Sequence, residues 1–405
     1  MSADQDRERL RSIALLVAAE VAALSTWFAA NAAMGQIKQH YALGPFHEAL
    51  LTSSVQAGYV VGTLVSAILT LPDRLDLRRM FFICALVAAA TTAALAFLPP
   101  TSPLAPALRF VTGASMAGLY PVGMAMVATW ARSDLGLLIG ILVGALTFGS
   151  ATPHLAASLS GVDWRATVLA SAVGALIAAI LVRFVTLGPN RAKAPPFRLS
   201  NALQGWRNKA LRQANFGYFG HMWELYAMWA WIPAYLAASF ASRYGAAPPI
   251  DAHLAAFLVI ATGALGAFAG GWYADRLGRT LVTSAAMIVS GACCLAIGFA
   301  FGGPVWLVMV VAIVWGVSVI ADSAQFSASV AELSEDSLRG SMLTLQTSIG
   351  FALTLVSIHL MPYVVELVGW RYAFCALAIG PALGVVAMLR LRAMPEAAKL
   401  AGGRR

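Results

Sequence analysis

The chain has 405 residues, of which 60% are hydrophobic and 11% are charged, and its mean hydropathy is +0.76. This composition excludes a water-soluble enzyme, because soluble domains are about half apolar and about a quarter charged. The net charge of +9 would suggest nucleic acid as a partner of a soluble protein. In a membrane protein its meaning depends on which side of the bilayer the basic residues occupy.

Apolar runs predict twelve membrane-spanning helices, each long enough to cross a hydrocarbon core about 30 Å thick. The first run is longer than the apolar part of a signal peptide and contains Glu20, so we expect it to be retained as a helix. In chain order the predicted spans are 12–35, 47–71, 80–99, 103–130, 135–160, 165–187, 211–240, 251–274, 280–300, 304–330, 339–363 and 369–392.

A stretch rich in proline and basic residues divides these spans six and six. An internal repeat supports the division, because Asp73-Arg74 recurs as Asp275-Arg276 at the same point of the second half. The sequence thus predicts an all-α integral membrane protein with two pseudo-symmetric halves. The predicted parts are an N-terminal six-helix bundle over 1–187, a cytoplasmic linker over 188–210 and a C-terminal six-helix bundle over 211–405.

Lysine and arginine are strongly segregated between alternate connecting segments. Of the 27 basic residues, Arg109 lies within a span, and only Lys38, Arg165, Arg243 and Arg371 would lie on outer segments if the N-terminus is inside. The positive-inside rule therefore predicts that both termini and the linker are cytoplasmic. Topology explains the basic charge, and nucleic acid is not an expected partner. Alanine richness and short loops favour a bacterial inner membrane.

A short basic loop joins the eighth and ninth predicted spans. An aspartate at the end of a helix can accept hydrogen bonds from a neighbouring helix N-terminus, and the arginines can meet lipid phosphates or a partner acid, so this loop could latch one conformation. Simple anchoring of a positive loop is the alternative interpretation. The residues assigned to it are Gly271, Asp275, Arg276, Gly278 and Arg279, with Asp73 and Arg74 in the first-half copy.

In this loop the chain resembles the major facilitator superfamily of secondary transporters, whose pattern is GxxxDRxGR. Arg109, followed by Gly113 in the fourth span, resembles a second motif of that family. The first-half loop departs from the pattern, with Asp76 in place of the inner glycine and Leu77 in place of an arginine. The resemblance covers nearly the whole chain and implies a twelve-helix fold in which spans one, four, seven and ten line a central cavity.

Charged residues are expensive inside a bilayer, so those present are candidates for function. Each of the four spans named above carries one acid or arginine on a helical stripe with aromatic, amide or hydroxyl side chains, a mixture typical of ligand sites. The residues predicted to bind substrate or couple its transport are Glu20, Trp27, Asn31, Arg109, Tyr120, His221, Glu224, Asp322 and Gln325.

Several roles remain open for these groups. Glu20, Glu224 and Asp322 could carry protons, because burial favours the neutral acid, or they could form static hydrogen bonds. Arg109 could bind an oxyanion with its planar fork, pair with an acid inside the fold, or reach towards the outer interface. His221 stands one turn from Glu224 and could carry a proton or serve only in packing.

These observations predict a secondary transporter that moves a small organic solute by alternating access, with proton-coupled symport of an organic anion as the leading hypothesis. A proton-driven exporter of a cationic or amphipathic compound is the alternative, and a transporter-like membrane receptor or sensor is the rival from another class. We expect a monomer with protons or another ion as coupling partner. The four cysteines show no metal-ligand spacing, and we expect neither metal nor cofactor nor enzymatic activity.

Overall fold

The computed structural model of the protein describes residues 3–132, 134–159, 161, 163–190, 206–335 and 338–405. The chain forms two compact units, residues 1–194 and 195–405, and each is described here by itself. The described residues are helical and contain no strand. Most of the predicted linker 188–210 lies outside the described residues.

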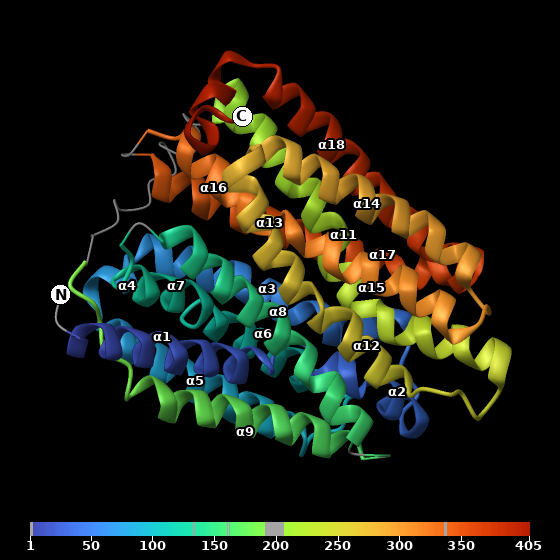
Figure 1. Ribbon diagram of the computed structural model, residues 1–405. Coiled ribbons are helices and arrows are strands. Elements are labelled where there is room, and N and C mark those ends of the chain that lie inside the picture. The colour runs from blue at the N-terminus through green and yellow to red at the C-terminus, as the bar shows by residue number, and fades with distance from the viewer. Residues whose placement is uncertain (1–2, 133, 160, 162, 191–205, 336–337) are drawn as a thin grey trace. The chain divides into compact units, whose positions relative to one another are not determined.

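Unit 1 contains nine helices in its described part, which run alongside one another in the bundle seen in Figure 1. Helix α3 packs against α6, and α9 packs against both α1 and α5. The helices are α1 (Ala3–Leu24), α2 (Ala29–His40), α3 (Pro45–Ile68), α4 (Leu71–Arg74), α5 (Leu77–Leu95), α6 (Leu104–Met116), α7 (Tyr120–Ala128), α8 (Leu135–Leu159) and α9 (Trp164–Val182).

Unit 2 repeats this kind of bundle. Helix α11 packs against α17 and α18, while α15 packs against α13 and α14. Its helices are α11 (Lys209–Tyr244), α12 (Ala252–Ala261), α13 (Gly263–Leu277), α14 (Arg279–Ala300), α15 (Val305–Ala321), α16 (Ser323–Leu333), α17 (Arg339–Ala373) and α18 (Ile379–Arg392), with 3₁₀ segments η1 (Phe374–Ala378) and η2 (Pro395–Gly403).

Ten helical stretches of the described chain are long and apolar enough to cross a membrane. Helix α11 is not among them; its 36 residues contain His221 and Glu224. The last of the ten stretches runs from Arg339 to Arg392. That stretch is interrupted at Gly369, whose φ of +73° and ψ of 168° are not helical. With α11 and this interruption counted, the observed helices are consistent with the twelve predicted spans.

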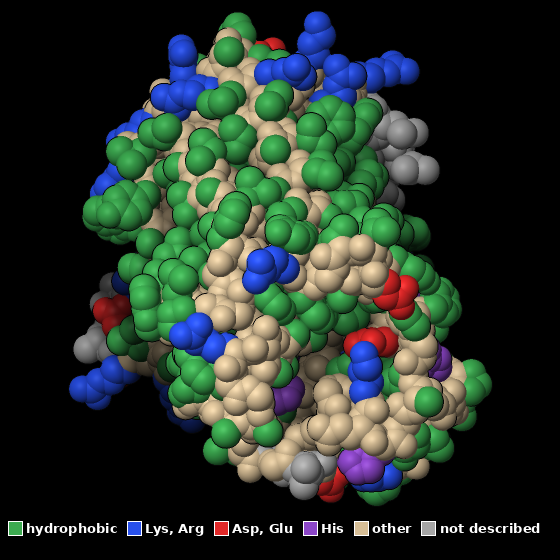
Figure 2. All heavy atoms as spheres, turned by 90° about the vertical axis from the view of Figure 1, so that its right-hand side faces the viewer, with side chains coloured by type: hydrophobic (Ala, Val, Ile, Leu, Met, Phe, Trp, Pro, Cys, Tyr) green, Lys and Arg blue, Asp and Glu red, His purple; other side chains and the backbone are tan. Residues whose placement is uncertain are grey.

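Large apolar side chains are widely exposed on the surface, as expected where lipid and not water is the solvent. Phe299 is 89% exposed and Leu367 is 84% exposed. Figure 2 shows hydrophobic side chains spread over much of the face in view, with charged groups in scattered positions. The chain is a multi-pass membrane protein.

Several of the predicted spans are divided between two α-helices. The first is broken between α1 and α2 at residues 25–28, the fourth between α6 and α7 at residues 117–119, the eighth at Thr262 between α12 and α13, and the tenth at Asp322 between α15 and α16. A break frees backbone groups from the helical ladder, which a membrane protein tolerates only where protein satisfies them. The breaks in the first and tenth spans coincide with the positions of two predicted site residues, Trp27 and Asp322.

Glycines allow the closest helix crossings, and the same crossing occurs in both units. A Cβ atom added at Gly113 of α6 would stand 1.9 Å from the carbonyl oxygen of Val55 on α3, and one at Gly316 of α15 would stand 2.0 Å from that of Val259 on α12. Backbone this close leaves no room for any side chain. Gly113 and Gly316 make equivalent crossings in the two halves, so the internal repeat of the sequence is also present in the structure.

We expect Gly113→Ala to destabilise the protein by about 1–3 kcal/mol, because the two helices must separate to admit the added methyl group. A Cβ atom at Gly140 of α8 meets nothing within 4 Å, so Gly140→Ala is the matched control. The melting temperature of the purified protein in detergent checks both. Equal melting temperatures for the two variants would contradict the importance of this crossing.

Candidate functional site

Arg109 holds the break in the first span. Its guanidinium donates from Nη1 to the carbonyl oxygen of Thr26 at 2.8 Å, from Nη2 to that of Trp27, and from Nε to that of Leu51 on α3 at 3.4 Å. The side chain is 1% exposed. Because α1 ends at Leu24, Arg109 supplies donors to the Thr26 and Trp27 carbonyls of the break in place of helical N–H groups.

Glu20 lies on α1, one turn before the break, and is fully buried. Neither of its carboxyl oxygens has a hydrogen-bond partner in the described part of the chain. It packs against Gly123 of α7, where an added Cβ would stand 1.7 Å from Oε1. The structure forms no ion pair between Glu20 and Arg109, so these two buried groups are held separately.

The other predicted residues of unit 1 lie in the break, on α2 and on α7. Trp27 lies in the break itself, with its ring 5.2 Å from that of Tyr59 on α3. Asn31 of α2 donates to the Thr52 hydroxyl at 3.0 Å, which fixes α2 to α3. Tyr120 is the first residue of α7 and is half-buried. Polar and aromatic groups of this site therefore come from several helices.

Glu224 of α11 is the best-satisfied acid in the interior of unit 2. Its Oε1 accepts from Trp315 Nε1 at 2.6 Å and from the Cys294 thiol at 3.1 Å, and its Oε2 accepts from the Ser290 hydroxyl at 2.9 Å. The residue is 1% exposed. These donors come from α14 and α15, so the carboxyl group joins three helices.

His221 and Asp322 form a second buried pair in unit 2. Nδ1 of His221 lies 2.9 Å from Oδ1 of Asp322, and each residue is 1% exposed. The aromatic rings of Tyr218 and Phe326 lie 6.1 and 5.5 Å from the imidazole. The structure thus brings together two of the predicted residues, at the break between α15 and α16, with Glu224 one helical turn along α11.

Gln325 is buried, and its side chain contacts the basic loop of unit 2. Its Oε1 accepts from Arg279 Nη1 at 2.6 Å, and Arg279 also donates two bonds to the Glu332 carboxylate, at 2.8 and 2.5 Å. Gly278, just before Arg279, has a φ of +95° that favours glycine. The basic loop of unit 2 is therefore tied to α16 through Arg279, and Gln325 is part of that tie.

The acid and the other arginine of this loop lie near the surface. The Asp275 carboxylate is exposed and lies 3.6 Å from Arg279, and the Arg276 guanidinium stacks on the Trp272 ring at 3.7 Å. Gly271 lies on α13, with the Gln325 amide nitrogen 3.9 Å from an added Cβ. The predicted latch remains a hypothesis.

The first-half loop is built differently. Asp73 and Arg74 lie on the single turn of α4, and Asp76 caps α5 by accepting from the backbone N–H groups of Arg78 and Arg79 at 3.0 and 3.1 Å. Asp76 occupies the place of Gly278 in the repeat, so the two halves end this loop with different caps. Leu77 occupies the place of Arg279 and cannot make its bonds.

Sequence reasoning missed Ser290, Cys294 and Glu332, which complete the contacts above. Their separations from their partners are 66, 70 and 53 residues, so no local spacing signals them. A serine and a cysteine in an apolar span carry no distinguishing pattern. In the described part of the chain no group of three His, Cys, Asp or Glu side chains could hold a metal ion.

Comparisons with known proteins agree with this fold. The sequence profile of the Major Facilitator Superfamily matches residues 16–245 and 214–405. A single-residue variant of the Escherichia coli fucose:proton symporter FucP is similar in structure with a TM-score of 0.64 and 18% identity, over 94% of this chain and 98% of that chain. The proton:xylose symporter XylE, bound to 6-bromo-6-deoxy-D-glucose, has a TM-score of 0.70 and 13% identity, over 95% of each chain.

No curated protein sequence matches the chain. Identities of 18% and 13% show the fold alone. The profile match spans both halves and almost the whole length, and it confirms the resemblance carried by the basic loop and by Arg109. The chain belongs to the Major Facilitator Superfamily and is a transporter, not an enzyme.

Proposed function

We propose that this transporter moves a small polar organic solute together with protons. The observation that carries the proposal is Glu20, a fully buried carboxyl group without a hydrogen-bond partner in the described chain. A carboxylate left alone in an apolar interior bears a desolvation cost that a bound proton removes. Such a group is suited to exchange a proton each time water reaches it.

Unit 2 supports the same proposal from other residues. His221 and Asp322 form a buried pair 2.9 Å apart, an arrangement in which imidazole and carboxyl can share or pass a proton. The two similar solved structures are, by their titles, proton symporters of fucose and xylose. Proton coupling is thus favoured both by the buried acids of this chain and by the nature of proteins with its fold.

The buried polar groups also bear on the charge of the solute. An organic anion needs a basic partner, and Arg109 is the only buried Lys or Arg among the described residues. Three of its donors are bound to carbonyl oxygens. The other buried residues predicted for the site carry acids, amides, an imidazole and an indole, which match an uncharged hydroxyl-rich solute better than an anion. We therefore propose a neutral polyol or sugar-like solute.

Proteoliposomes loaded with a pH-sensitive dye test this proposal. Adding a neutral sugar or polyol that is a substrate, without an imposed gradient, should acidify the lumen as solute and protons enter together. Organic acids and organic cations in the same panel test the anion symport and cation export hypotheses. Movement of none of these compounds would contradict the proposed class of solute.

Glu20→Gln should abolish the proton signal, because the amide keeps the shape of the side chain but binds no proton. Glu48→Gln is the matched control, since the Glu48 carboxylate is paired with Lys38 at 2.8 Å near the start of α3. Solute entry without proton movement in the unmodified protein would contradict the coupling. An undiminished proton signal in Glu20→Gln would remove Glu20 from it.

A further inference from the structure

An elongated apolar groove opens on the surface of unit 2 between α11, α17 and α18. Its volume is about 440 Å³, and its walls include Phe216, Trp223 and Leu383. Two polar side chains, Gln213 and Arg390, lie in its lining. Gln213 is in the first turns of α11 and Arg390 is in the last turn of α18, so both polar groups mark the same end of the groove.

The glycines of α11 and α18 fix the floor of this groove. A Cβ atom added at Gly220 would stand 2.3 Å from the carbonyl oxygen of Gly380, and one at Gly380 would stand 2.4 Å from that of Gly220. The helices are in backbone contact at this crossing. The larger side chains of the groove lie beside the crossing and extend along α18 to Arg390.

The length of the groove matches one leaflet of a bilayer. Its α18 lining runs from Ile379 to Arg390, which at 1.5 Å per residue is about 16 Å. Half of a hydrocarbon core is about 15 Å. An acyl chain lying in the groove would therefore extend from the glycine crossing to Arg390, and Arg390 would then meet the lipid headgroup.

The polar end is also strongly basic. Lys209 and Arg212 belong to the first turn of α11, and Arg392 ends α18 beside Arg390. Arg392 is engaged with Thr280 at 3.2 Å, whereas Arg390 is exposed and forms no hydrogen bond or ion pair with any described residue. Its planar fork is suited to a phosphate group.

Trp206 contacts two of the aromatic residues that line the groove, Phe216 and Phe219. The Trp206 ring stacks on Phe219 with centroids 6.2 Å apart and meets Phe216 edge-on at 5.9 Å. Tryptophan is favoured at the boundary between hydrocarbon and headgroups, because its ring is apolar and its N–H is polar. This position agrees with the headgroup level set by Arg390.

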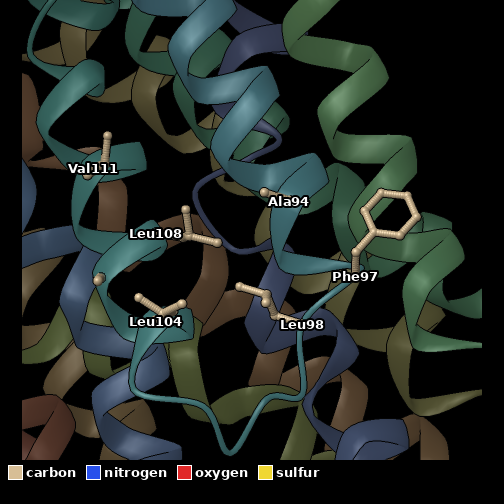
Figure 3. Close-up of a pocket in the computed structure, with 7 residues that line it drawn as sticks. Ala94, Phe97, Leu98, Leu104, Leu108 and Val111 are labelled. Atoms are coloured by element: carbon tan, nitrogen blue, oxygen red, sulfur yellow. The ribbon is translucent and has the colours of Figure 1, made fainter.

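We propose that this groove binds one glycerophospholipid with an anionic headgroup, its acyl chain along the apolar wall and its phosphate at Arg390 and Gln213. A pocket of unit 1 provides the contrast. It holds about 470 Å³ and is lined only by apolar side chains, among them Phe97, Leu104 and Val111 (Figure 3). Without a polar group it has nothing to distinguish one headgroup from another.

Native mass spectrometry of the purified full-length protein tests the proposal. The probes are phosphatidylglycerol and phosphatidylcholine with identical acyl chains, offered in equal amounts. The unmodified protein should retain phosphatidylglycerol about fivefold over phosphatidylcholine, the preference expected from one basic residue. Arg390→Gln should reduce that ratio to near one, and Leu383→Trp should displace both lipids by filling the groove. Val386→Trp serves the same purpose should Leu383→Trp not fold.

The control variant is Arg79→Gln. Arg79 is exposed in the first turn of α5, so it is another arginine at the end of a span but outside this groove. The preference for phosphatidylglycerol should survive its loss. Retention of the preference in Arg390→Gln, or an equal loss in Arg79→Gln, would overturn the proposal, because the preference would then belong to the positive surface as a whole.

Discussion

Replacing Arg109 by lysine is expected to lower the free energy of unfolding by about 2–4 kcal/mol, although the charge is kept. The guanidinium reaches carbonyls on two spans, those of Thr26 and Trp27 in the break and that of Leu51 on α3. A lysine ammonium is a compact group that cannot extend over all three. Each buried carbonyl left without a donor costs about 1–3 kcal/mol.

Thermal unfolding in detergent measures this effect, with Arg183→Lys as the control because Arg183 is exposed beyond the end of α9. The experiment also separates two roles of Arg109. If the residue held an anionic solute instead of the helix break, Arg109→Lys would unfold at the original temperature and lose only solute affinity. Arg109→Met leaves all three carbonyls without a donor, so we expect a loss of stability at least as large as with lysine.

The second large effect is expected from Asp322→Asn. The asparagine keeps the size of the side chain at the break between α15 and α16 but cannot exchange a proton with His221, whose Nδ1 lies 2.9 Å away. Accumulation of solute against its gradient should fall at least about tenfold, the loss that corresponds to about 1.4 kcal/mol of coupling free energy. Exchange of solute across the membrane at equal concentrations should persist.

Uptake into proteoliposomes with and without an imposed proton gradient measures the two quantities. Asp251→Asn is the matched control, because Asp251 caps α12 at the surface and asparagine caps a helix equally well. If Asp322→Asn accumulates solute as well as the unmodified protein, the pair of His221 and Asp322 is structural. A loss of both accumulation and exchange would indicate a general defect of the fold.

Much of the architecture follows from the sequence, because a bilayer constrains the length and polarity of every span. The predicted runs correspond to helices in the structure, and the family resemblance is confirmed. The breaks could not be predicted. Ser25 and Thr26 are compatible with a helix locally, and the break there is stabilised by Arg109, which lies 83 residues from Thr26 in the chain.

The candidate site was likewise predictable only in part. Helical spacing placed His221 and Glu224 one turn apart on one face, and both are buried in the structure. Spacing could not show that Asp322 faces His221 or that Gln325 binds Arg279, because those contacts join helices distant in sequence. The roles assigned to these residues in binding and coupling stay predictions until the variants are measured.

The bond from Arg109 to the Trp27 carbonyl also has a consequence for the synthesis of the protein. These residues are 82 positions apart, and a ribosome that adds about 5–20 residues per second needs roughly 4–16 s to bridge them. During that interval the first span is already made but Arg109 is not, so the segment can satisfy its carbonyls as a continuous helix. The break can become stable only when span four supplies Arg109, and a chain stalled before residue 109 would hold the first span in a form that differs from the finished fold.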